Sequence, residues 1–100
     1  MEITRQQRVT LIEEELDVGN DSGDGWWPIS YRGEEHGLLR HTDDGWRAEW
    51  RTKPDKAWMK STSLLDPSQP FETAVRWAKT AVATGLAMVE EVEERDRRAT

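Results

Sequence analysis

The chain has 100 residues, of which 35% are hydrophobic and 34% charged, and its formal net charge is -6 at neutral pH. This length suits one domain with a modest core, and the six tryptophans offer large surfaces to bury, which disordered chains lack. The absence of cysteine excludes disulfides, thiolate catalysis and cysteine-ligated metals. We expect a soluble, cytoplasmic protein with no segment that spans a membrane.

The charges are unevenly distributed along the chain. Residues 1–37 hold three arginines against nine acidic residues, a net -6. Residues 38–60 hold six basic against four acidic residues, a net +2, and residues 61–100 hold five against seven, a net -2. The pattern therefore separates an acidic first third from a mildly basic middle.

The N-terminal segment begins with a capping pattern. Thr4 followed by Gln7 fits a capping box, and apolar residues then recur at helical spacing, which favours a helix. A strand through Val9 and Leu11 is the alternative, because these residues also suit a sheet. Residues 1–18 are therefore predicted to be a helix or a strand.

The centre is typical of an antiparallel meander. Residues 19–25 form an acidic loop with three glycines, and residues 26–62 alternate between short apolar segments and turns. One turn is expected between Gly33 and Gly37, and Asp44-Gly45 is a two-residue hairpin signal. The expected strands cover residues 27–32, 38–42, 46–52 and 57–61.

A turn at Asp44-Gly45 would place Arg40 opposite Glu49 and Leu39 opposite Trp50. Strand alternation then separates two faces. The inner, apolar face would hold Leu39, Trp46, Ala48 and Trp50, with His41 among them. The outer face would hold Arg40, Thr42, Arg47, Glu49 and Arg51, joined by Lys56, Trp58 and Lys60 if Met59 points inward.

A long helix is predicted over residues 70–97. Pro70 suits its first turn, and an apolar stripe recurs at steps of three and four from Phe71 through Gly85 to Val92. Glutamates and arginines four residues apart make the charged end, residues 90–98, able to stay helical without packing. The expected fold is α+β: a three- or four-stranded antiparallel meander covered on one face by this helix, with an N-terminal helix or strand beside it.

The sequence contains no catalytic or metal-ligating constellation. His36 and His41 match no standard ligand spacing, no serine or threonine has an evident base, and the glycine-rich loop is acidic and would repel phosphate. We therefore expect a non-enzymatic protein without metal or cofactor.

Two surfaces are candidates for binding. The first is acidic and would dock onto a basic, nucleic-acid-binding protein, the alternative being simple solubility; it comprises Glu13, Glu14, Glu15, Asp17, Asp21, Asp24, Glu34 and Glu35. The second is the outer sheet face, which would bind nucleic acid through phosphate contacts and indole stacking; it comprises Arg40, Arg47, Arg51, Lys56, Trp58 and Lys60. A homodimer through the C-terminal helix, beside its Ala/Gly flank, is a third possibility.

Three resemblances accompany these features. YRG (31–33), GWRAEWR (45–51), KAWMKST (56–62) and FETAVRWAKTAV (71–82) resemble, in order, the plant ethylene-response type of DNA-binding domain. That likeness implies a three-stranded sheet that enters the major groove, although Glu34-Glu35 stand where that family tends to be basic. The element order also resembles a double-stranded-RNA-binding domain, without its lysine cluster. The small, acidic, cysteine-free profile is similar to phage-encoded anti-CRISPR inhibitors, which implies an inhibitor acting in the host cytoplasm.

Overall fold

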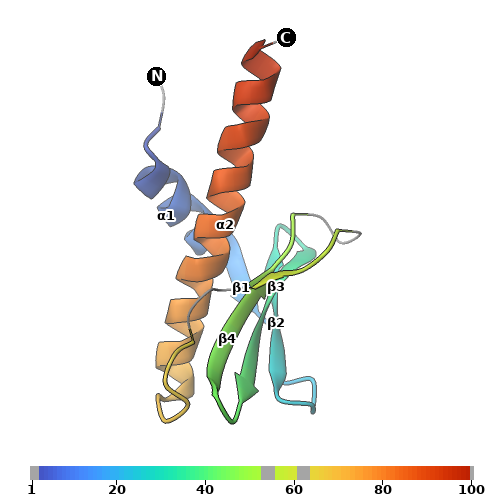
Figure 1. Ribbon diagram of the computed structural model, residues 1–100, viewed down its shortest axis with the longest axis vertical. Helices are drawn as coiled ribbons and strands as arrows, with labels where there is room; N and C mark the ends of the chain where they lie inside the picture. The colour runs from blue at the N-terminus through green and yellow to red at the C-terminus, as the bar shows by residue number, and fades with distance from the viewer. Residues whose placement is uncertain (1–2, 53–55, 61–63, 100) are drawn as a thin grey trace.

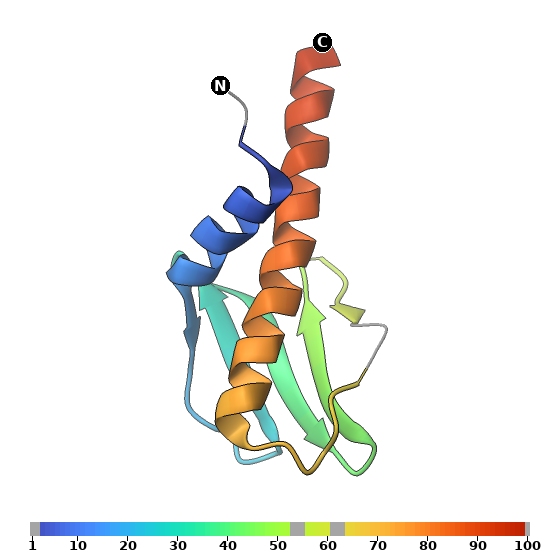
Figure 2. The same cartoon turned by 90° about the vertical axis from the view of Figure 1, so that its left-hand side faces the viewer.

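The structure, a computed structural model, describes residues 3–52, 56–60 and 64–99. Five strands form one antiparallel sheet in chain order, with α2 lying along one face of it and α1 packed beside α2 near one end of the sheet (Figures 1 and 2). This confirms the α+β prediction, with more strands than expected. The elements are α1 (Arg5–Glu15), β1 (Leu16–Val18), β2 (Trp26–Tyr31), β3 (Glu34–Thr42), β4 (Gly45–Trp50), β5 (Met59–Lys60) and α2 (Phe71–Ala99).

The N-terminal segment is a helix that continues directly into a strand. The capping box is present: the Thr4 side chain accepts from the Gln7 backbone N–H, and the Gln7 side chain accepts from the Thr4 backbone N–H. The helix ends at Glu15, and Leu16 already pairs with Tyr31 of β2. The predicted helix is therefore correct up to residue 15. Its last turn is wrong because Leu16 and Val18 alternate around Asp17 and bury one face of a strand.

The turn between β2 and β3 is shorter than predicted. Arg32 and Gly33 have φ values of 53° and 83°, and Tyr31 pairs with Glu34. Positive φ at both central residues defines a type I′ turn, the kind of two-residue hairpin turn for which Asp44-Gly45 carries the usual sequence signal. The expected Gly33–Gly37 turn is wrong, since β3 begins at Glu34 and accommodates its extra residue as a bulge.

The hairpin between β3 and β4 reverses at residues 43–44, and its register differs from the prediction by two positions. Arg40 lies opposite Arg47 and Leu39 opposite Ala48, so the predicted oppositions with Glu49 and Trp50 are wrong. A shift of two positions preserves the alternation of side chains. The predicted inner and outer faces are therefore the observed ones.

The inner sheet face and α2 form the core. Leu39, Ala48 and Val82 are fully buried, and α2 continues unbroken through Gly85. The predicted stripe does not stay buried to its end, because Val92, 51% exposed, lies in the part of α2 that extends past the sheet (Figure 1).

The charged end of α2 is held by α1. Arg8 lies 3.0 Å from Glu90 and 2.8 Å from Glu94, and Arg5 lies 2.9 Å from Glu91. Glu91 and Glu94 thus pair with arginines of α1, so this end of α2 packs against α1, a contact that the sequence did not reveal. No helix in the described part of the chain is long and apolar enough to cross a membrane.

Candidate binding surfaces

Three chain segments converge at one end of the sheet, shown at the bottom of Figure 1. The N–H of His41 donates to the carbonyl oxygen of Gly25 at 2.8 Å, which joins the β1–β2 loop to β3. Trp46 holds the segment before α2 through two hydrogen bonds. Its backbone N–H donates to the Leu65 carbonyl oxygen at 2.8 Å, and its indole N–H donates to the Gln69 carbonyl oxygen at 3.1 Å. The β1–β2 loop, the β3–β4 turn and the start of α2 therefore lie together.

These segments carry a dense set of exposed carboxylates, which we call the acidic end. Residues 19–25, 43–44 and 66–72 contain no lysine or arginine. The Asp66 carboxylate accepts from the backbone N–H and hydroxyl of Ser68 at 2.8 and 2.7 Å, and these bonds lower its pKa. The members of the acidic end are Asp21, Asp24, Asp43, Asp44, Asp66 and Glu72.

The acidic surface predicted from the sequence is divided between two ends of the sheet. Asp21 and Asp24 belong to the acidic end, whereas Glu34 lies opposite Tyr31, at the other end of β2. At that second end Glu15 pairs with Arg32 at 3.1 Å. The remaining predicted members lie at or near the second end, on α1, β1 and β3: Glu13, Glu14, Asp17 and Glu35.

Two of those carboxylates have further partners. Glu35 lies 3.8 Å from the Arg51 guanidinium, and Glu34 lies 3.4 Å from Nε2 of His36. The second end therefore mixes carboxylates with cations. Asp43, Asp44, Asp66 and Glu72 were not identified from the sequence as part of a site, because only the folded chain brings their segments beside Asp21 and Asp24.

The outer sheet face is left open by both helices (Figure 2). The register places Trp26, Arg40 and Arg47 in one row across β2, β3 and β4. Two arginines directly opposite repel each other, and Arg40 turns diagonally to the Glu49 carboxylate at 3.0 Å. The neighbouring row across the four strands β2 to β5 contains Pro28, Leu38, Glu49 and Lys60.

Trp58 has a structural contact that the sequence did not reveal. The Arg51 guanidinium lies 4.2 Å from the centroid of the Trp58 ring, and its Nε donates to the Glu35 carbonyl oxygen at 3.3 Å. The expected free stacking platform is thus already covered by a cation. Lys56 and Lys60 are exposed.

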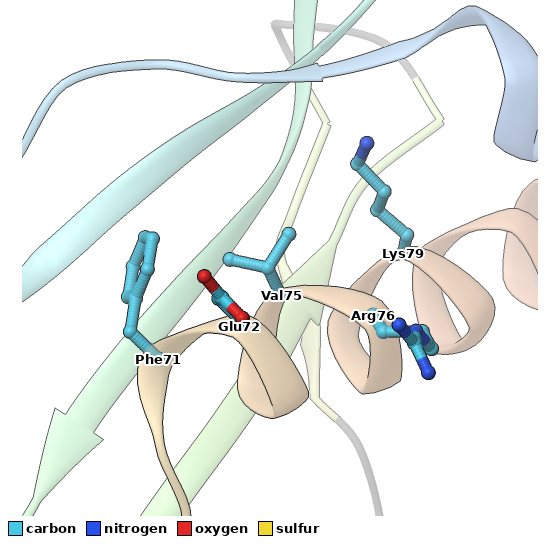
Figure 3. A pocket seen from close by; sticks show the side chains of 5 residues that line it. All are labelled: Phe71, Glu72, Val75, Arg76 and Lys79. Carbon is cyan, nitrogen blue, oxygen red and sulfur yellow. The ribbon is translucent and has the colours of Figure 1, made fainter.

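Helix α2 has two shallow hollows along its exposed sides. The first, about 430 Å³, is shown in Figure 3, where Phe71, Val75 and Lys79 rise from successive turns on one side; it is lined by Phe71, Glu72, Val75, Arg76 and Lys79. The second, about 470 Å³, is lined by Leu65, Thr73, Arg76, Trp77, Thr80 and Ala81.

The buried histidine is His36, not His41, which the sequence placed among the inner-face residues. His41 shares the inner face but is exposed, stacked on Trp46 with ring centroids 4.1 Å apart. His36 is the buried one, with Nδ1 3.0 Å from the Arg51 carbonyl oxygen. Among residues 3–52, 56–60 and 64–99, no group of three or more potential ligands could hold a metal ion.

Comparison with protein-family models, curated proteins and solved structures gives no match to this chain. The resemblances to the ethylene-response domain, the RNA-binding domain and the anti-CRISPR inhibitors stay predictions.

Proposed function

We propose that this chain is a non-enzymatic inhibitor or adaptor that docks its acidic end onto the basic surface of a nucleic-acid-binding protein. One observation carries the proposal. Removing the six carboxylates of the acidic end from the 20 acidic residues of the chain leaves 14, which equals the number of lysines and arginines. The whole formal net charge of -6 is therefore accounted for by one end of the molecule.

Exposed carboxylates on three neighbouring loops offer oxygens to lysine and arginine side chains much as a phosphate backbone does. Such a surface steers a basic partner by long-range attraction, and salt weakens that attraction because it screens exposed charges. The Asp66 carboxylate stays ionised well into acid because its pKa is lowered by Ser68.

A nuclear magnetic resonance titration with a short lysine- and arginine-rich peptide tests this proposal. We expect amide shifts at residues 21–24, 43–44 and 66–72, and affinity that falls as salt is raised. The Asp43→Asn/Asp44→Asn variant should bind more weakly, because it removes two charges while asparagine suits a turn as well as aspartate does.

The matched control is Glu13→Gln/Glu14→Gln, which changes the net charge equally on α1. It should leave the affinity close to that of the parent. Equal losses in both variants would mean that the peptide senses only net charge, and shifts confined to the second end of the sheet would place the docking surface elsewhere. Either result overturns the proposal.

A second candidate function is nucleic-acid binding by the open sheet face. It is favoured by the row of Trp26, Arg40 and Arg47, in which Arg47 has no ion pair within the described ranges. Against it, Glu49 and Glu35 already partner two arginines of this face. A gel shift at low salt on duplex and single-stranded DNA and RNA, with Arg47→Glu/Lys60→Glu as the loss-of-binding variant, tests it. No shift removes this candidate, since phosphate contacts alone give measurable affinity at low salt.

A further inference from the structure

One flank of α2 carries apolar side chains that the core leaves partly or largely exposed, although Trp77 and Ala81 also touch the edge of the core. Trp77, Ala81, Thr84 and Met88 follow one another at steps of four, three and four, so they form a single stripe along the helix. Met88 is 47% exposed, and the other three are partly exposed. In Figure 2, α1 lies beside α2 and the sheet lies behind the helix.

The threonines on and beside this stripe present methyl groups rather than unsatisfied hydroxyls. The Thr84 hydroxyl donates to the Thr80 carbonyl oxygen at 2.7 Å, and the Thr80 hydroxyl donates to the Arg76 carbonyl oxygen at 3.2 Å. Because both donors are satisfied inside the helix, burying these residues against another surface leaves no hydroxyl donor without a partner.

The shape of the stripe is complementary to itself. Large side chains stand at its two ends, Trp77 and Met88, and small ones stand between them, Ala81 and Thr84. The hollow of about 470 Å³ lies beside Trp77 and Ala81. Small residues in the middle allow two helices to approach closely while the large residues of each fill the space beside the other.

We propose that this flank of α2 binds a second copy of the chain, with the two α2 helices antiparallel about a twofold axis. In this register Trp77 faces Met88 of the second copy, and Ala81 faces Thr84 of the second copy. The same register brings Val92, also exposed, to Thr73 at the far edge of the hollow. Each exposed apolar side chain of the flank then has a partner, as a twofold interface requires.

Charge complementarity selects the antiparallel arrangement. Arg95 continues the stripe toward the C-terminus, and in this register it faces Pro70 of the second copy, between Asp66 and Glu72 of the acidic end. A parallel pair in register would instead place Arg95 against Arg95. The proposal concerns a surface other than the docking surface, and the two meet only where Arg95 of the second copy would lie beside Asp66 and Glu72.

Sedimentation velocity over a range of protein concentrations tests the association. We expect a monomer–dimer equilibrium that shifts toward dimer as the protein concentration is raised. Met88→Glu should weaken it by roughly tenfold or more, because it would bury a charge in an apolar contact. Leu11→Glu is the matched control: Leu11 is 54% exposed on α1, so the same change there should leave the dimer intact.

Disulfide formation tests the register, and the native chain gives no background because it has no cysteine. A mixture of the Ala81→Cys and Thr84→Cys chains should form a crosslinked pair, whereas each chain alone should form little. Crosslinking of each variant to itself would indicate a parallel pair and overturn the proposal. A parent that stays monomeric at every concentration and salt, or equal losses in Met88→Glu and Leu11→Glu, would also overturn it.

Discussion

The indole of Trp50 lies directly on the backbone of Gly85. A Cβ atom built on Gly85 would stand 2.5 Å from Cε2 and 2.6 Å from Cδ2 of that ring. The sheet makes the reciprocal approach at Gly37, where a Cβ atom would stand 2.9 Å from a methyl carbon of Val82. Two glycines, one on α2 and one on β3, therefore set how closely the helix and the sheet pack.

Gly85→Ala should destabilise the protein, although alanine usually stabilises a helix interior by about 1 kcal/mol relative to glycine. The added methyl would displace the Trp50 ring, at a cost of about 1–3 kcal/mol for overpacking. Urea unfolding measures the change. Thr80→Ala, exposed on the same helix, should be neutral or stabilising; a Gly85→Ala variant as stable as the parent would contradict the contact.

Gly45→Ala should cost more than Gly33→Ala. Both positions have positive φ, 146° and 83°, but a Cβ atom at Gly33 meets nothing within 4 Å, whereas at Gly45 it would collide with the Leu65 carbonyl oxygen. Backbone strain alone costs about 1–2 kcal/mol. The collision adds a further loss by opening the bridge between Trp46 and Leu65. Equal unfolding free energies for the two variants would exclude this second component.

Thr4→Ala should lower the unfolding free energy by about 1 kcal/mol, because it removes the acceptor for the Gln7 backbone N–H. Thr10 gives a control on the same helix. Its hydroxyl only donates back to the Gln6 carbonyl oxygen, so Thr10→Ala should have little effect. Circular dichroism with thermal unfolding compares the two, and equal losses would mean that the capping box contributes nothing.

The ion pair between Arg5 and Glu91 makes the unfolding free energy depend on pH in the acidic range. The hydrogen bond from Arg5 lowers the pKa of Glu91 below its ordinary value of 4.5. A carboxylate with a lowered folded-state pKa stabilises the fold above its ordinary pKa, and that stabilisation is lost as pH falls through the lowered value. Arg5→Met should therefore flatten the loss of unfolding free energy below pH 4.5. The control Arg76→Met should lose unfolding free energy with falling pH as steeply as the parent does. Measurement of the unfolding free energy against pH compares the parent and the two variants, and the same pH dependence in all three would argue against the Arg5–Glu91 pair.

The faces of the sheet could be predicted from the sequence, whereas the register could not. Alternation in residues 46–50 fixes which side chains point inward, and this survives any shift of two positions. The register was predicted wrongly because Asp44-Gly45 carries the usual sequence signal of a two-residue hairpin turn. Glycine is needed at position 45 for a different reason, since the backbone of Leu65 lies too close for a side chain. The actual type I′ turn uses Arg32, held at φ 53° while its guanidinium lies 4.9 Å from the Tyr31 ring centroid.

The candidate surface was harder to predict than the fold. Asp21 and Asp24 stand out in a local window of sequence, but Asp43, Asp44 and Asp66 join them only through contacts between distant segments. Local charge counting therefore placed the acidic surface along the first third of the chain. In the folded chain, two of the eight predicted residues share the acidic end with four carboxylates from other segments.

The ion pairs of Arg5 and Arg8 join residues that are 82 to 86 positions apart. All five strands lie between these two helices in the sequence, so the ion pairs close a loop that contains the whole sheet. Arg5 and Arg8 therefore keep these partners only when residues 90–94 of α2 are present. Truncation by a premature stop codon before Glu90 would thus loosen the opposite terminus as well.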